Sequence, residues 1–202
     1  MAIPTKYRSV AEPQFASYDF YDLFTGTGYK SFYPSDARSD ASGALVYFIS
    51  PQSVYADVGF VHDTTNPAEY NFDLLFEVPI TISGTLTFNV PFGITGAGSM
   101  TATLNAIFYK VSGGVETQIG STIYKTFTGA SADTRIFSGK TDIATTRFRA
   151  GDTFRFSITI DTGADPQYVD IFFDPKNRTG TDLGSSINST ITQSIINLPI
   201  II

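Results

Sequence analysis

The chain has 202 residues, enough for one large domain or a domain with terminal arms. Its content of 42% hydrophobic and 16% charged residues is typical of a globular protein. A formal net charge of −6 leaves no basic surplus to neutralise phosphates, which argues against nucleic acid and anionic membranes as partners. The lack of cysteine excludes disulfides, thiolate nucleophiles and Cys-ligated zinc, and we expect no cofactor.

Residues 1–40 are expected to form an N-terminal arm and the first strand. The opening MAIPTKYRSV lacks the apolar run of a signal peptide, and no stretch reaches the length of a membrane-spanning helix. We therefore expect synthesis in the cytoplasm and no membrane partner. Residues 13–33 hold eight aromatic side chains among turn formers. They either pack on the core as a first strand and loop or dock on another chain, with Phe20, Tyr21 and Phe24 as candidate interface residues.

Residues 41–175 are dominated by period-two alternation. In residues 153–160 the apolar side chains Phe154, Phe156, Ile158 and Ile160 share one face and polar side chains the other. One apolar and one polar face are typical of antiparallel sheets. The turns at Gly113–Gly114 and Gly151–Asp152 separate strands. We predict an all-β fold, an antiparallel two-sheet sandwich of jelly-roll type, with other strands at 43–49, 54–61, 71–78, 85–90, 104–108, 115–119, 121–127, 134–138, 141–148 and 169–173.

Residues 176–202 are expected to form a C-terminal tether and an apolar tail. The tail ends in Leu198, Ile200, Ile201 and Ile202, which make an adhesive patch or an edge strand. Two alternatives stay equal: the tail folds back as the last strand of its own sandwich, or it is an arm that contacts another chain. The polar stretch before it resembles a tether and favours the arm. An arm predicts that deleting residues 183–202 leaves the sandwich folded and weakens assembly.

Few residues suggest catalysis or metal binding. The one histidine, His62, neighbours Asp63, but no GxSxG motif marks a nucleophile, and we interpret it as a solvent-facing residue at a strand end. Asp161, Asp165 and Asp170 surround a turn and are weak candidates for calcium ligands, because their spacing does not match an EF-hand.

The residue types give little support for carboxylate catalysis or for sugar binding. Glu69 and Glu77 are the nearest Glu residues, and nothing marks them as the pair across a cleft that glycosidases use. We therefore expect no enzyme. Sugar-binding faces favour exposed aromatic rings; the chain has no tryptophan, and its 11 tyrosines are better suited to packing with the hydroxyl in water.

The stretch from Ile107 to Pro175 contains a Gly-Gly hairpin between YKV and ETQIGS, an AGD turn at Ala150–Asp152, an alternating strand after it, and a closing FDP. With these features it resembles jelly-roll structural proteins of virus particles, in particular head-decoration and minor capsid proteins of tailed phages. The opening ASYDFYDLFTGTGYKSFYP is similar to the start of proteins in phage-like genomes. The resemblance implies binding to the major capsid protein on the virion surface, as a trimer with arms that reach neighbouring subunits. It transfers no catalytic residue.

The leading hypothesis is thus a non-enzymatic structural protein of a virus particle, which decorates or cements the capsid through oligomerisation and terminal-arm contacts. The alternative is a receptor- or glycan-binding β-sandwich module of the kind found at a fibre tip.

Overall fold

Twelve strands and no helix make up the part of the chain described by this computed structural model, which is residues 27–38, 44–63, 68–95, 100–129, 133–162 and 168–201. No helix in these ranges could therefore cross a membrane. The strands are β1 (Thr27–Arg38), β2 (Leu45–Ser50), β3 (Phe60–Asp63), β4 (Ala68–Leu75), β5 (Ile80–Thr95), β6 (Met100–Ser112), β7 (Val115–Gln118), β8 (Ile123–Gly129), β9 (Asp133–Phe148), β10 (Thr153–Asp161), β11 (Tyr168–Phe172) and β12 (Ile195–Ile201).

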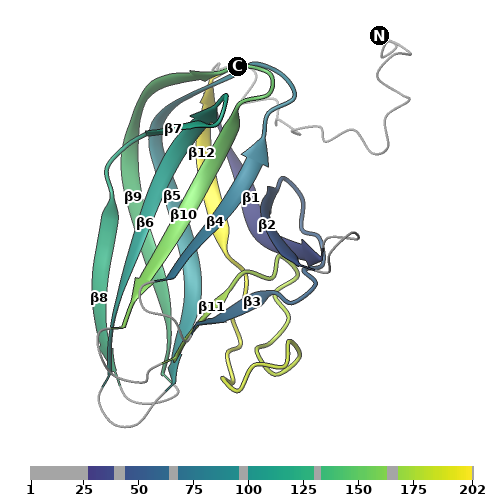
Figure 1. Cartoon of the computed structure of the whole chain (residues 1–202), viewed down its shortest axis with the longest axis vertical. Coiled ribbons are helices and arrows are strands. Elements are labelled where there is room, and N and C mark those ends of the chain that lie inside the picture. Colours follow the sequence, from purple (N-terminus) through teal and green to yellow (C-terminus); the bar gives the residue numbers. More distant parts are fainter. Residues whose placement is uncertain are drawn as a thin grey trace.

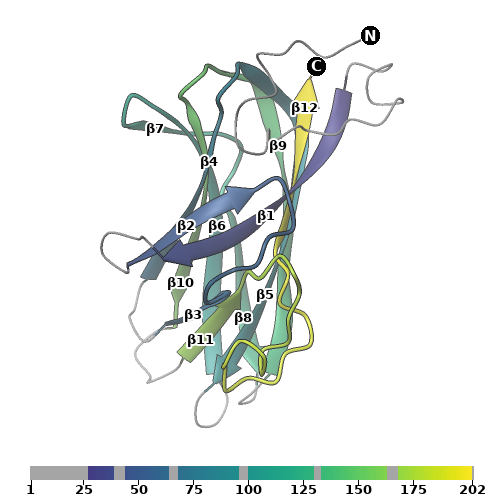
Figure 2. The same cartoon turned by 90° about the vertical axis from the view of Figure 1, so that its right-hand side faces the viewer.

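The strands lie in two layers that share β1 (Figures 1 and 2). Layer A contains β3, β11, β5, β9 and β12, and layer B contains β2, β4, β10, β6, β7 and β8. Residues 27–32 of β1 pair with β12 in layer A, and residues 33–38 of the same strand pair with β2 in layer B. This strand therefore links the two layers by main-chain hydrogen bonds along one side of the molecule.

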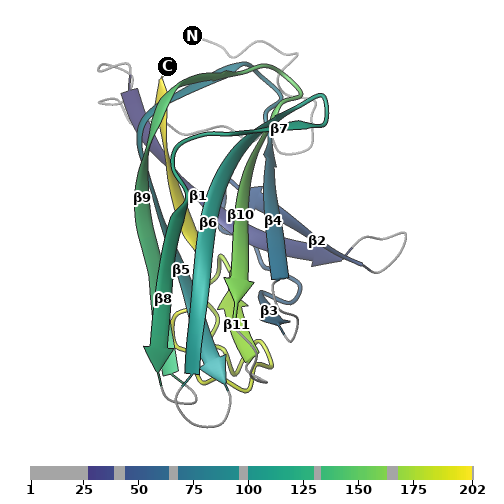
Figure 3. The ribbon, with the colours of Figure 1, turned by 60° about the vertical axis from the view of Figure 1, so that its left-hand side comes forward.

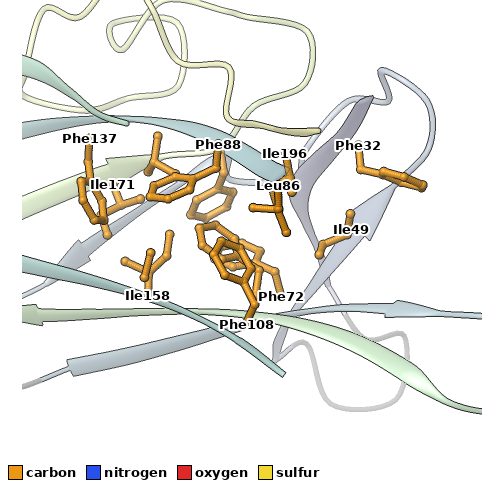
Figure 4. Packing of buried hydrophobic residues seen from close by; sticks show 14 of the residues in the cluster. Phe32, Ile49, Phe72, Leu86, Phe88, Phe108, Phe137, Ile158, Ile171 and Ile196 are labelled. Atoms are coloured by element: carbon orange, nitrogen blue, oxygen red, sulfur yellow. The ribbon is translucent and has the colours of Figure 1, made fainter. Parts of the chain in front are cut away.

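Phenylalanine side chains from both layers form the centre of the core (Figure 4). Phe88 of layer A lies 5.6 Å from Phe156 of layer B, measured between ring centroids, and Phe156 stacks on Phe108 at 5.1 Å. All three side chains are at most 1% exposed. Burying a side chain of this size contributes about 1.5–3 kcal/mol. The alternation predicted for residues 153–160 is confirmed, because its four apolar side chains all face this core.

The predicted hairpin at Gly113–Gly114 is also confirmed. Ser112 of β6 pairs with Val115 of β7, so the two glycines form the whole turn, with φ of 57° and 82°. A two-residue turn with both central φ angles positive matches the right-handed twist of the flanking strands, and glycine adopts it without strain.

Several strand predictions are corrected by the structure. Residues 54–59 are irregular instead of extended, and they are held by the carboxylate of Asp36, which accepts hydrogen bonds from the backbone amides of Val58 and Gly59 at 3.1 and 3.2 Å. The two strands expected at 134–138 and 141–148 are one strand, β9. The sheet is mostly antiparallel, but β2 and β4 meet in parallel. The prediction of an all-β fold holds, and that of a purely antiparallel arrangement holds only in part.

The apolar tail forms β12, a central strand between β5 and β1. Leu198 and Ile200 are 0% and 2% exposed, so these two expected interface residues belong to the chain's own core, and the arm interpretation is corrected for them. Pro199 lies in the irregular step of the β5 pairing between Asn197 and Ile200, a place where a strand tolerates a residue without an amide proton. The tail thus folds in cis, the other alternative left open by the sequence.

Residues 175–194, which we call the strap, form most of the connection from β11 to β12. Arg178 holds its start: the guanidinium donates to the buried carboxylate of Asp174 at 3.0 Å and to the carbonyl oxygen of Ala56 at 2.6 Å. Further along, the side chain of Ile187 lies directly over Gly93 of β5, where a Cβ atom would come within 2.3 Å of Ile187 Cδ1. The strap is therefore packed on layer A and does not act as a free tether.

Candidate functional site

The other sequence-predicted interface residues have mixed positions. Ile201 is half-buried at the end of β12. Phe20, Tyr21, Phe24 and Ile202 lie outside the described residues, so their expected contacts stay predictions.

The calcium candidates are not brought together as a group. Asp161 ends β10 and is exposed, and Asp165 lies outside the described residues. Asp170 is 1% exposed on β11 and accepts a hydrogen bond from the Ser185 hydroxyl of the strap at 2.7 Å. Within the ranges that the structure covers, no three His, Asp or Glu side chains are grouped so that they could hold a metal ion.

The remaining candidates for chemistry are also dispersed. His62 lies on β3, where its backbone is opposite Asp170 of β11. Glu77 is exposed after the end of β4, not within a strand as expected, and Glu69 lies on β4 near its other end. The two glutamates are therefore not a catalytic pair.

The main cluster of polar and aromatic side chains lies on the outer face of layer B. Phe154, Phe156 and Ile158 of β10 point into the core, so the alternate residues of that strand point outward. Register then fixes which side chains share this face, because directly opposed residues of antiparallel strands project to the same side. We define the outer face as Glu69, Asn71 and Asp73 of β4, Arg155, Ser157 and Thr159 of β10, Asn105, Ile107 and Tyr109 of β6, Glu116 of β7 and Tyr124 of β8.

Arg155 is the centre of this face (Figure 3 shows β10 between β4 and β6). Its Nε and Nη2 atoms both donate to the carboxylate of Asp73, at 2.7 Å each, and its Nη1 donates to Glu116 at 2.5 Å. This bidentate geometry fixes the orientation of the guanidinium relative to the Asp73 carboxylate. The hydrogen bonds to Asp73, followed by the charges of both carboxylates, raise the pKa of Arg155. Arg155 therefore stays charged and orients two carboxylates.

Tyr109 and Glu69 extend the polar cluster along the face. Tyr109 is opposite Arg155 in register, and burial followed by the negative charges of Glu116 and Glu69 raises the pKa of its phenol. The phenol therefore stays protonated at neutral pH and can donate a hydrogen bond. The carboxylate of Glu69 accepts a hydrogen bond from the Ser157 hydroxyl at 3.0 Å, which leaves its other oxygen available.

The outer face offers acceptor and donor groups beside two aromatic rings. Adjacent strands carry three carboxylates, one guanidinium, several hydroxyls and amides, and the rings of Tyr109 and Tyr124. Tyr124 is 74% exposed. Carboxylate oxygens and amides bind hydroxyl groups, and aromatic faces pack on apolar C–H surfaces. The arrangement can therefore bind a hydroxyl-rich molecule that lies flat on the sheet.

Sequence reasoning missed this cluster because its members are far apart along the chain. Asp73 and Arg155 are separated by 82 residues, and Glu116 by 39 from Arg155. Only the polar positions of an alternating strand, read together with the strand pairing, could have located them.

Neither a family model nor a curated protein sequence matches the chain. Its fold is similar to that of solved hydrolases. A CocE/NonD family hydrolase from Staphylococcus aureus matches 87% of this chain at 9% identity with a TM-score of 0.52, and an alpha-amino acid ester hydrolase matches 85% at 13% identity with a TM-score of 0.52. An aminopeptidase from the marine sediment archaeon Thaumarchaeota archaeon matches 85% at 10% identity with a TM-score of 0.51.

The chain spans only 37%, 36% and 37% of the length of those three proteins. At such identities the likeness shows the fold alone, and a fold does not by itself specify an activity. At the level of the fold, this likeness overturns the expectation that the chain is no enzyme, because the three structures are of a CocE/NonD family hydrolase, an ester hydrolase and an aminopeptidase.

Proposed function

We propose that the chain is a two-sheet β-sandwich of jelly-roll type that binds a hydroxyl-rich ligand, of the oligosaccharide class, on the outer face of layer B. The observation that carries the proposal is the orientation of the Asp73 and Glu116 carboxylates by Arg155, with Tyr109 opposite it in register. Pre-oriented acceptors cost less entropy when they bind a ligand than free ones do.

The ligand lies across β4, β10 and β6 and uses three kinds of contact. Carboxylate oxygens of Asp73, Glu116 and Glu69 accept hydrogen bonds from its hydroxyls. The phenol of Tyr109 donates to a ring or hydroxyl oxygen. The exposed ring of Tyr124, opposite Asn105 at the neighbouring strand, packs on an apolar sugar face.

The experiment is a binding screen of the full chain on an array of neutral oligosaccharides, followed by titration of those retained. Tyr124→Ala is expected to weaken binding by about tenfold, the effect of losing an aromatic anchor worth 1–2 kcal/mol. Tyr29→Ala is the matched control, because Tyr29 is 62% exposed on β1, away from the face. Equal losses in the two variants, or no bound oligosaccharide at all, would contradict the proposal.

Hydrolysis is a second candidate, favoured by the similarity to the CocE/NonD hydrolase and the ester hydrolase. In that case the chain would hold the substrate on its outer face, and another part of a larger enzyme would hydrolyse it. Mass spectrometry of oligosaccharides and amino-acid esters incubated with the protein tests this. Unchanged masses for every compound that binds would argue against it.

A structural role in a virion, with a trimer on a major capsid protein, stays a prediction. Burial of Leu198 and Ile200 removes the apolar tail as a free capsid contact, and for this reason we prefer ligand binding. Light scattering of the purified chain at several concentrations tests the trimer directly.

A further inference from the structure

An apolar groove lies at the end of layer A where β12 ends. It is lined by Val78, Pro79 and Ile80, at the connection from β4 to β5, and by Ile200 and Ile201 of β12. Thr81 and Arg147 complete the lining of this groove of about 460 Å³.

The groove is lined by an exposed aliphatic side chain and by a cation. Val78 is 66% exposed although it is a large aliphatic residue. Arg147 is also exposed, and no carboxylate among the described residues forms an ion pair with it. Apolar side chains beside a cation that forms no ion pair with another described residue favour an occupant with apolar side chains and negative charge.

The chain itself enters the described fold beside this groove. Thr27, the first described residue, pairs with Ile201, which is one of the lining residues. Three residue steps separate Phe24 from Thr27, which keeps the Cα atom of Phe24 within about 11 Å of that of Thr27.

The preceding sequence has the chemistry that the groove requires. Residues 15–24, FASYDFYDLF, lie outside the described residues and contain five aromatic side chains and two aspartates, Asp19 and Asp22. The aromatic residues supply apolar groups for the groove walls. The aspartates supply negative charge for Arg147.

We propose that the groove lined by Val78, Ile200 and Arg147 is the docking site for residues 15–24 of the same chain. The dock joins the N-terminal segment to the end of β12. Docking in this groove does not depend on ligand binding on layer B.

The absence of tryptophan from the chain allows a direct test in the full-length protein. Phe20→Trp introduces a single tryptophan in the docking segment, and Tyr7→Trp introduces one outside it. Emission from the F20W variant is expected at shorter wavelength than emission from Y7W. Adding Val78→Glu to F20W is expected to weaken docking by about tenfold and to shift the emission toward that of Y7W, because a charge enters the apolar contact.

Ile136→Glu is the matched control, because Ile136 is another exposed aliphatic residue, on β9 away from the groove. It should leave the F20W emission unchanged, and circular dichroism checks that every variant is folded. The proposal is overturned if F20W and Y7W emit alike, or if V78E has no more effect than I136E. Emission that shifts to longer wavelength on dilution also overturns it, because a second copy would then supply the segment.

Discussion

Ending the chain after Ser194 removes β12 and takes three buried side chains, Ile196, Leu198 and Ile200, out of the core. At about 1.5–3 kcal/mol each, their burial contributes about 5–9 kcal/mol, before the lost hydrogen bonds to β1 and β5 are counted. Small domains are stable by only about 5–15 kcal/mol in total. We therefore expect the truncated chain to be unfolded at 25 °C, the opposite of what an intermolecular arm predicts.

A point substitution provides a graded version of the same test. Leu198→Ala is expected to lower the free energy of unfolding by about 2–5 kcal/mol, whereas Ile191→Ala, at a 47% exposed strap position, should change it by less than about 0.5 kcal/mol. Urea titration followed by circular dichroism measures both variants and the truncated chain. A truncated chain that keeps a cooperative transition near that of the full chain would refute the reasoning.

Three further predictions concern buried and packed positions. The pKa of Asp152 is lowered to about 2, mainly by the hydrogen bond from the backbone amide of Arg149. The carboxylate therefore contributes its full stabilisation of the fold above the unfolded pKa near 4 and loses it as the pH falls toward 2. Thermal melts should show this loss, and Asp152→Asn should abolish it. The pKa of Asp36 is raised by burial, so carbon-13 NMR should find its midpoint above the ordinary value near 3.9, with folding favoured as it protonates. Gly93→Ala should destabilise by about 1–3 kcal/mol through the clash with Ile187, and in urea titrations the double variant with Ile187→Ala should lose less stability than the sum of the two single variants.

The parts of the fold that sequence could predict are those written in local patterns. Phe154 and Phe156 alternate with polar residues, and two glycines at 113 and 114 are enough for a hairpin, so neighbouring residues carry the information. The position of β12 is not local. Pro199 in a terminal apolar stretch is typical of an edge strand, and only the register irregularity opposite β5 lets it occupy a central one.

The candidate site escaped prediction for a related reason. Arg155, Asp73 and Glu116 are each ordinary polar residues of an alternating or short strand. What groups them is the order of strands across layer B, which no single segment encodes. The strap was misjudged as a tether because its Ser, Thr and Asn side chains are polar, yet they are used for internal hydrogen bonds such as that from Ser194 Oγ to the Phe172 carbonyl.

The insertion of β12 between β1 and β5 also sets the order in which the protein can fold. Ser31 and Asn197, paired in this sheet, are 166 residues apart, so half of β1 has no partner in layer A until nearly all of the described chain has been synthesised. Closing so long a loop is slow, and the waiting edges of β1 and β5 can pair with other chains. Expression at lower temperature or with chaperones should therefore raise the soluble yield, a consequence of the strand order alone.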